Sequence, residues 1–171
     1  SDDGGSSWTR ISISDESTGQ PTLASVAAPD GAGEATIFVG TLEGTTYRSD
    51  QGGADGSWTR TGDVEQDVVS IAPRPQFAEE PELFVSTTGS IFRSVDGGES
   101  FTEVNELRRS SLAISPAYID DRTVFAASEQ GLDVSRDGGE TWTQVDGFVE
   151  VRAMGWGAPI VDGGPLAIYV A

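Results

Sequence analysis

Three residue types that often carry chemistry are missing from the sequence. It contains no cysteine, no histidine and no lysine, and its ten basic residues are all arginines. Without cysteine there is no disulfide framework, thiol nucleophile or thiolate-bound metal. Without histidine there is no imidazole base, no imidazole metal ligand and no Ser-His-Asp triad. We therefore predict no cofactor and no metal site, and we assign no catalytic residue.

Long apolar runs and an excess of positive charge are also missing. No stretch approaches the roughly 18 apolar residues that span a bilayer, and the first residues show no signal-peptide core. Twenty-eight acidic against ten basic residues give a net charge of −18. This charge argues against nucleic acid and against anionic membranes, since both need basic patches. A lysine-free acidic composition is typical of halophilic proteins, although a GC-rich genome also favours arginine over lysine.

What the chain does contain is an internal repeat of about 43 residues, found by aligning it with itself. Four segments align on the pattern Ser-x-Asp-x-Gly-x-Ser/Thr-Trp, and each ends on an aromatic residue. These aromatic residues, 50, 43 and 41 positions apart, are Trp8, Trp58, Phe101 and Trp142. A proline that closes an apolar stretch recurs in the same register, at Pro29, Pro73, Pro116 and Pro159. Two markers in one register make a chance match an unsatisfactory explanation.

Each repeat unit reads as four strands separated by turns, with little that favours a helix. A small-residue strand ends at the proline, a more apolar strand follows, a third strand runs into the motif, and a fourth opens with the aromatic residue. Four strands per unit of this length are typical of a propeller blade. We therefore predict that 1–171 is a single all-β propeller segment. The predicted blades are 21–63, 66–106 and 110–148, with a partial blade formed from 1–14 and 151–171.

The repeated motif resembles the Asp-box, or bacterial neuraminidase repeat, of sialidases, sortilin-type receptors, some xyloglucan-cleaving glycosidases and a photosystem II assembly factor. The resemblance implies a turn between the third and fourth strands of a blade. In that turn the acid accepts backbone hydrogen bonds, the glycine adopts positive φ, and the aromatic ring packs between blades. The structural residues it implies are Ser1, Asp3, Gly5, Trp8, Ser49, Gln51, Gly53, Trp58, Ser94, Asp96, Gly98, Phe101, Ser135, Asp137, Gly139 and Trp142.

Two details of the motif qualify this interpretation. In the second copy Gln51 replaces the acid, and three residues separate Gly53 from Ser57 where the other copies have one. We expect that turn to be longer and less tightly held. Calcium binding is an alternative use for the acidic turns, but one acid per turn supplies fewer oxygen ligands than a calcium ion needs.

A sialidase would need an arginine triad, a tyrosine with a partner glutamate, and an aspartate. The nearest string to the usual Arg-Ile-Pro motif is Arg74-Pro75, which lacks the isoleucine. Tyr47 shares its repeat position with Phe92 and is interpreted as a core residue. A glycosidase that uses two carboxylates stays open as an alternative, because 28 acids provide many pairs.

Propeller ligands usually bind the loops on the face opposite the Asp-boxes. The charged residues that we place on that face are Asp15, Glu16, Glu43, Asp63, Glu65, Asp67, Glu106, Arg108, Arg109, Glu129 and Glu150. Most of them form a solvated acidic rim. The adjacent pair Arg108 and Arg109 is the candidate contact for an acidic ligand or partner. The alternative is that this pair balances Glu103 and Glu106 on the surface.

The chain opens on one motif and closes after the second strand of a unit, which leaves three arrangements open. It is a fragment of a longer propeller, or two copies complete an eight-bladed ring through open sheet edges, or a small ring closes with one incomplete blade. We interpret it as a non-catalytic interaction module of a larger extracellular or cell-surface protein. Its partners are then a protein, the rest of the propeller or a glycan. The alternative is an Asp-box glycoside hydrolase or carbohydrate-binding propeller.

Overall fold

A computed structural model describes residues 4–7, 13, 21–27, 34–106, 108, 111–157 and 167–171. Within these ranges the chain forms fourteen strands and one four-residue helix. The strand predicted to open at Trp8 lies outside the described residues. No helix in the described ranges is long and apolar enough to cross a membrane.

The strands form three four-stranded antiparallel sheets and one strand pair. The first sheet contains β1 (Pro21–Ala27), β2 (Thr36–Thr41), β3 (Thr45–Ser49) and β4 (Thr59–Asp63). The second contains β5 (Val68–Pro73), β6 (Leu83–Thr87), β7 (Ile91–Ser94) and β8 (Thr102–Asn105). The third contains β9 (Ser111–Ile114), β10 (Val124–Ser128), β11 (Gly131–Ser135) and β12 (Thr143–Val145). The strand pair is β13 (Met154–Gly157) with β14 (Ala167–Val170).

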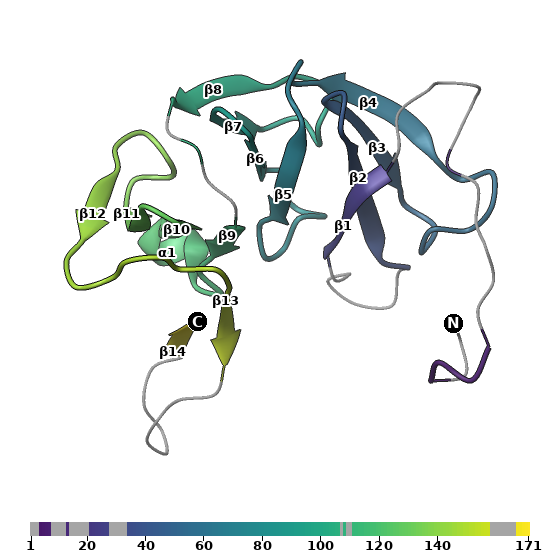
Figure 1. The fold of residues 1–171 in the computed structure, drawn as a ribbon. Coiled ribbons are helices and arrows are strands. Elements are labelled where there is room, and N and C mark those ends of the chain that lie inside the picture. The colour runs from purple at the N-terminus through teal and green to yellow at the C-terminus, as the bar shows by residue number, and fades with distance from the viewer. Residues whose placement is uncertain are drawn as a thin grey trace.

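Each sheet keeps its strands in chain order, and the sheets follow one another along an arc (Figure 1). The first strands of successive sheets contact one another, β1 with β5, β5 with β9, and β9 with β13. These strands therefore line the inside of the arc, as the innermost strands of propeller blades do. The predicted fold class is confirmed: the chain is all-β and forms a partial β-propeller. The helix α1 (Tyr118–Asp121) is an addition to the predicted pattern and connects β9 to β10.

The core lies between neighbouring sheets, where it buries the apolar faces that a sheet exposes on its own. One cluster joins the first and second sheets around Phe38, Ile71 and Leu83. A second cluster joins the second and third sheets around Phe84 and Tyr118, whose rings meet edge to face with centroids 6.3 Å apart. Burial between the sheets thus fixes the relative positions of the turns at both ends of the blades.

Candidate functional site

The turns between the third and fourth strands of each sheet all contain the same kind of hydrogen bond. In each turn a serine hydroxyl oxygen accepts the N–H of a glycine four residues later. The pairs are Ser49 with Gly53 at 3.1 Å, Ser94 with Gly98 at 2.8 Å and Ser135 with Gly139 at 2.8 Å. All three glycines, and Gly5 in the first copy of the motif, have φ between 81° and 94°. A side chain with a Cβ is strained in this region, which is why glycine recurs there.

We call each of these turns, closed by its serine–glycine hydrogen bond, a latch turn. In the second and third sheets a carboxylate adds further hydrogen bonds to this latch. Asp96 accepts the backbone N–H of Ser100 at 3.0 Å, and Asp137 accepts that of Thr141 at 2.9 Å. Desolvation opposes ionisation of Asp96, but hydrogen bonds from Ser100 and Ser94 outweigh it and lower its pKa from 3.8 to about 2. For Asp137, hydrogen bonds from the hydroxyl and the amide of Thr141 come first, then that of Ser135, and its pKa also falls to about 2. Both carboxylates therefore stay ionised until the pH falls to about 2.

This latch predicts an acid-dependent loss of stability. Because the folded pKa of Asp137 lies below 3.8, its contribution is complete above that value and disappears as pH falls through about 2. We expect Asp137→Asn to lower the free energy of unfolding at neutral pH and to flatten its slope between pH 4 and 2. Urea titrations across that range measure it. Asp55→Asn, at an exposed acid without a hydrogen bond among the described residues, is the control. Equal slopes in wild type and Asp137→Asn would rule the latch out.

The second copy of the motif departs from this arrangement, as its sequence does. The Ser49 and Ser57 hydroxyls bond at 2.6 Å, and the Ser57 N–H donates to the Ala54 carbonyl at 3.1 Å. Among the described residues the side chain of Gln51 makes no hydrogen bond, and the buried indole N–H of Trp58 has no acceptor. By contrast, Phe101 packs on the first core cluster and Trp142 on the second. Ser1, Asp3 and Trp8 lie outside the described residues.

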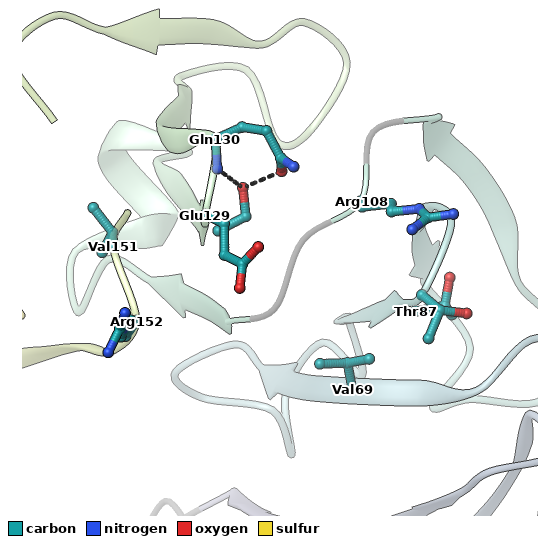
Figure 2. A pocket seen from close by; sticks show the side chains of 9 residues that line it. Val69, Thr87, Arg108, Glu129, Gln130, Val151 and Arg152 are labelled. Atoms are coloured by element: carbon teal, nitrogen blue, oxygen red, sulfur yellow. Dashed lines mark hydrogen bonds between the residues drawn. The ribbon is translucent and has the colours of Figure 1, made fainter. Parts of the chain in front are cut away.

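A cavity of about 450 Å³ opens at the other end of the strands, between the second and third sheets (Figure 2). Strand β5, the β6–β7 and β10–β11 turns, and the connections β8–β9 and β12–β13 all contribute to it. Its lining consists of Val69, Thr87, Thr88, Arg108, Ser128, Glu129, Gln130, Val151 and Arg152. This volume is in the range of small-molecule and cofactor pockets.

Local turn chemistry fixes the walls of this cavity. The Thr87 hydroxyl oxygen accepts a hydrogen bond from the Ser90 N–H at 2.9 Å, and the Thr87 O–H donates to Oε1 of Gln66 at 2.7 Å. In the next blade the Ser128 hydroxyl oxygen accepts the Gln130 N–H at 3.1 Å. These bonds close the two turns tightly, as serine and threonine do when they bond their own backbone two or three residues on. The side chains at the turn tips therefore project into the cavity from fixed positions.

The cavity places two arginines and one carboxylate together. Arg108 and Thr87 lie at one end, Val151 and Arg152 at the other, and the Glu129 side chain lies between them (Figure 2). The Val151 N–H donates to the Ser128 carbonyl at 3.1 Å, which ties the Arg152 segment to the turn that carries Glu129. Arg152 lies 4.0 Å from Glu150, but both side chains are exposed, so this pairing is weak. Of the predicted arginine pair, Arg108 lines the cavity, and Arg109 lies outside the described residues.

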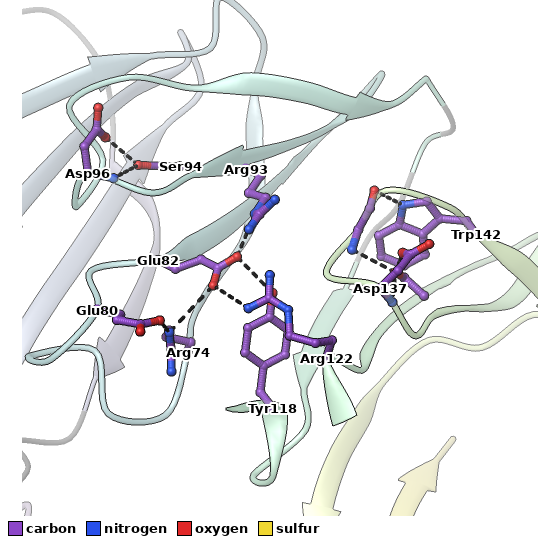
Figure 3. Close-up of polar contacts among 12 residues, drawn as sticks. Arg74, Glu80, Glu82, Arg93, Ser94, Asp96, Tyr118, Arg122, Asp137 and Trp142 are labelled. Carbon is purple, nitrogen blue, oxygen red and sulfur yellow. Dashed lines mark hydrogen bonds and ion pairs between the residues drawn. The ribbon is translucent and has the colours of Figure 1, made fainter. Parts of the chain in front are cut away.

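A second polar cluster is buried at the opposite end of the strands, beside the latch turns (Figure 3). Glu82, only 4% exposed, accepts hydrogen bonds from Arg93 at 2.6 Å and from the Tyr118 hydroxyl at 2.9 Å. Arg122 lies 3.3 Å and Arg74 3.9 Å from its other oxygen. Tyr118 and Arg122 belong to the third sheet's segment and the others to the second, so the cluster ties two blades together.

The cluster holds three arginines, a tyrosine and a glutamate, which are residue types that a sialidase uses. Tyr118 is fully buried, however, and burial together with the Glu82 charge raises its pKa far above the ordinary value. A protonated, inaccessible phenol is a structural group and a poor nucleophile. Sequence reasoning missed this cluster, although Glu82 stands where the neighbouring repeats have Thr36 and Thr123. An acid at the start of the most apolar strand was the available signal.

No family model matches this chain, and no curated protein sequence matches it. Solved structures with a similar fold include an ancestral GH74 enzyme, with a TM-score of 0.55, 22% identity, 73% of this chain covered and 18% of that one. BBS1N in complex with ARL6DN gives a TM-score of 0.67 and 16% identity, with 95% and 50% covered. YCF48 bound to D1 peptide gives 0.54 and 17%, with 82% and 43% covered.

This chain thus spans half or less of the length of each of these neighbours. At such identities a structural likeness establishes the fold and leaves ligands open. The neighbours and the row of four-stranded sheets lead to the same conclusion: the architecture is that of a partial β-propeller.

Proposed function

We propose that this chain is an Asp-box propeller module without catalytic activity, which holds a protein partner at the two-arginine cavity. The observation that carries the proposal is the position of Arg108 and Arg152 in one cavity, on the loop end of the strands. The whole chain has a net charge of −18. The two arginines therefore make this cavity locally positive on a protein that is negative as a whole. Acidic groups of a partner are attracted to such a positive site.

The latch geometry supports the Asp-box part of the proposal. The carboxylates of Asp96 and Asp137 close their turns on the residue four positions later, and the glycines adopt the positive φ that the motif implies. These turns occupy the end of the blades away from the cavity. One end of each blade then serves stability and the other is left for binding.

Two of the structural neighbours support the protein-partner part, because they were solved with a partner bound: BBS1N with ARL6DN, and YCF48 with a D1 peptide. Transferring protein binding from them to this chain is part of the proposal. We also propose an extracellular or cell-surface setting, which a strongly acidic and cysteine-free repeat protein tolerates, since its fold needs no disulfide.

A glycoside hydrolase is the second candidate, favoured by the likeness to the ancestral GH74 enzyme. Hydrolysis of the usual kind needs two carboxylates on either side of the scissile bond. In the described lining of the cavity Glu129 is the sole carboxylate. This composition supports binding over hydrolysis at the cavity.

A capture experiment with matched variants tests the proposal. The wild-type chain is immobilised, secreted proteins of the source organism are passed over it, and retained proteins are identified by mass spectrometry. We expect the double variant Arg108→Gln, Arg152→Gln to lose a partner that wild type retains. Charges at an interface speed the association of oppositely charged partners and make the bound surfaces electrostatically complementary. The controls are the two single variants and Arg136→Gln, which removes one positive charge, as each single variant does, from an exposed residue in the latch turn of the third sheet.

Two results would contradict the proposal. One is retention of the same proteins by the wild type and the double variant. The other is turnover of chromogenic glycosides by wild type that disappears in Glu129→Gln, which would make the chain a glycosidase. Thermal unfolding of all variants checks that the exposed substitutions leave the fold intact, as surface changes usually do.

A further inference from the structure

The charges of the cavity are ordered, and the order restricts which ligand fits. Arg108 lies at one end, Arg152 at the other, and Glu129 between them (Figure 2). A cavity built for a simple polyanion would exclude a central carboxylate, because like charges at short range repel. The cavity therefore carries a plus, minus, plus pattern.

The central carboxylate is available to a ligand. Glu129 lies at the tip of the β10–β11 turn, is exposed, and makes no ion pair or side-chain hydrogen bond with the described residues. Its turn is held from both sides: the Ser128 hydroxyl oxygen accepts the Gln130 N–H, and the Gln144 amide donates to the Gln130 carbonyl at 3.0 Å. A carboxylate on a rigid turn loses little conformational entropy on binding, which favours its use in recognition.

From this pattern we infer that the cavity binds an extended peptide segment whose side chains alternate acidic, basic, acidic. The acidic side chains face Arg108 and Arg152, and the basic one faces Glu129. An extended segment presents every second side chain to one face, so the charged residues stand at alternate positions. Val69, a half-buried residue of the lining, provides apolar surface for the aliphatic stems of those side chains.

This inference rests on the proposed function and adds the charge sequence of the ligand. It also separates a peptide from an acidic polysaccharide, which has carboxylates but no basic group. The two ligands respond in opposite ways to the loss of Glu129. A polyanion binds more tightly once the central repulsion is gone, whereas the alternating segment loses an attraction.

Binding of two synthetic peptides to the full chain tests the inference. Both are blocked, fluorescently labelled and seven residues long, with glutamate second and sixth; the fourth residue is lysine in one and glutamine in the other. We expect wild type to prefer the lysine peptide by about fivefold at low salt, the upper end for an exposed ion pair. In Glu129→Gln the preference disappears or reverses, and in the Arg108→Gln, Arg152→Gln variant both peptides weaken. Arg136→Gln leaves both affinities at the wild-type values.

Each other outcome overturns the inference. These outcomes are equal affinity of wild type for the two peptides, preference for the glutamine peptide, an unchanged preference in Glu129→Gln, and failure of the lysine peptide to bind. The proposed function is judged separately by the capture experiment. If capture depends on the two arginines but the lysine peptide does not bind, the cavity is still supported as the partner site, and the alternating charge order of the ligand is contradicted.

Discussion

Glu82→Gln is expected to destabilise the chain by about 3–5 kcal/mol, the cost of breaking a buried ion pair by removing one partner. The carboxylate of Glu82 is the common acceptor for Arg93, Arg122 and the Tyr118 hydroxyl. Glutamine keeps the volume but presents an amide NH₂ to guanidinium groups that are themselves donors. Arg74, which is 4% exposed, is then left with less compensation for its buried charge.

The matched control for this variant is Glu80→Gln. Glu80 also pairs with Arg74, but its side chain is 71% exposed, and without it Glu82 still lies 3.9 Å from the buried guanidinium of Arg74. Its loss should lower the free energy of unfolding by under about 1 kcal/mol. Urea denaturation of both variants measures the difference. Similar small losses in the two variants would show that Glu82 does not anchor the second blade to the third.

The strand pattern and the fold class were predictable because they depend on short-range features that repeat. Proline at a strand end, glycine at a turn and alternating or continuous apolar residues each act within a few positions of the chain. Repetition then adds information that one unit lacks. Phe38 and Phe84 occupy the same place in their repeats, and both are fully buried between sheets.

The polar contacts between blades were not predictable in this way. Glu82 and Tyr118 are 36 residues apart, and their hydrogen bond depends on how one blade is rotated against the next. Arg74 illustrates the difficulty. In the sequence, Arg74-Pro75 is the nearest match to the Arg-Ile-Pro motif of sialidases. In the structure, the guanidinium of Arg74 lies in the buried cluster beside the latch turns. Such pairings are set by tertiary packing, which a period of about 43 residues does not specify.

The cavity was predictable in part. Arg108 and Glu129 were placed on the loop end because strand order fixes which turns lie together, and both line the cavity. Arg152 was not singled out, since its place follows from the bond between the Val151 N–H and the Ser128 carbonyl. Strand order thus locates charged residues at this end of the blades, but their order around one cavity required the structure.

Gly139→Ala is the second substitution with a large expected effect. Gly139 has φ of 89°, and a Cβ there would lie 2.7 Å from the ring carbon Cε1 of Phe84 in the neighbouring blade. The left-handed backbone alone costs alanine about 1–2 kcal/mol. The collision with a fully buried ring adds about 1–3 kcal/mol, as overpacking of a core does. Urea denaturation should therefore show a marked fall in the free energy of unfolding.

Gly147→Ala separates the two causes. Gly147 has nearly the same φ, 88°, but no atom lies within 4 Å of the position that its Cβ would take. It should thus show the backbone cost alone, about 1–2 kcal/mol, and Gly139→Ala should exceed it by the packing cost. If the two variants lose equal stability, the latch turn of the third sheet does not pack tightly against Phe84. The contact between Gly139 and Phe84 then does not contribute to the packing of this turn on the preceding blade.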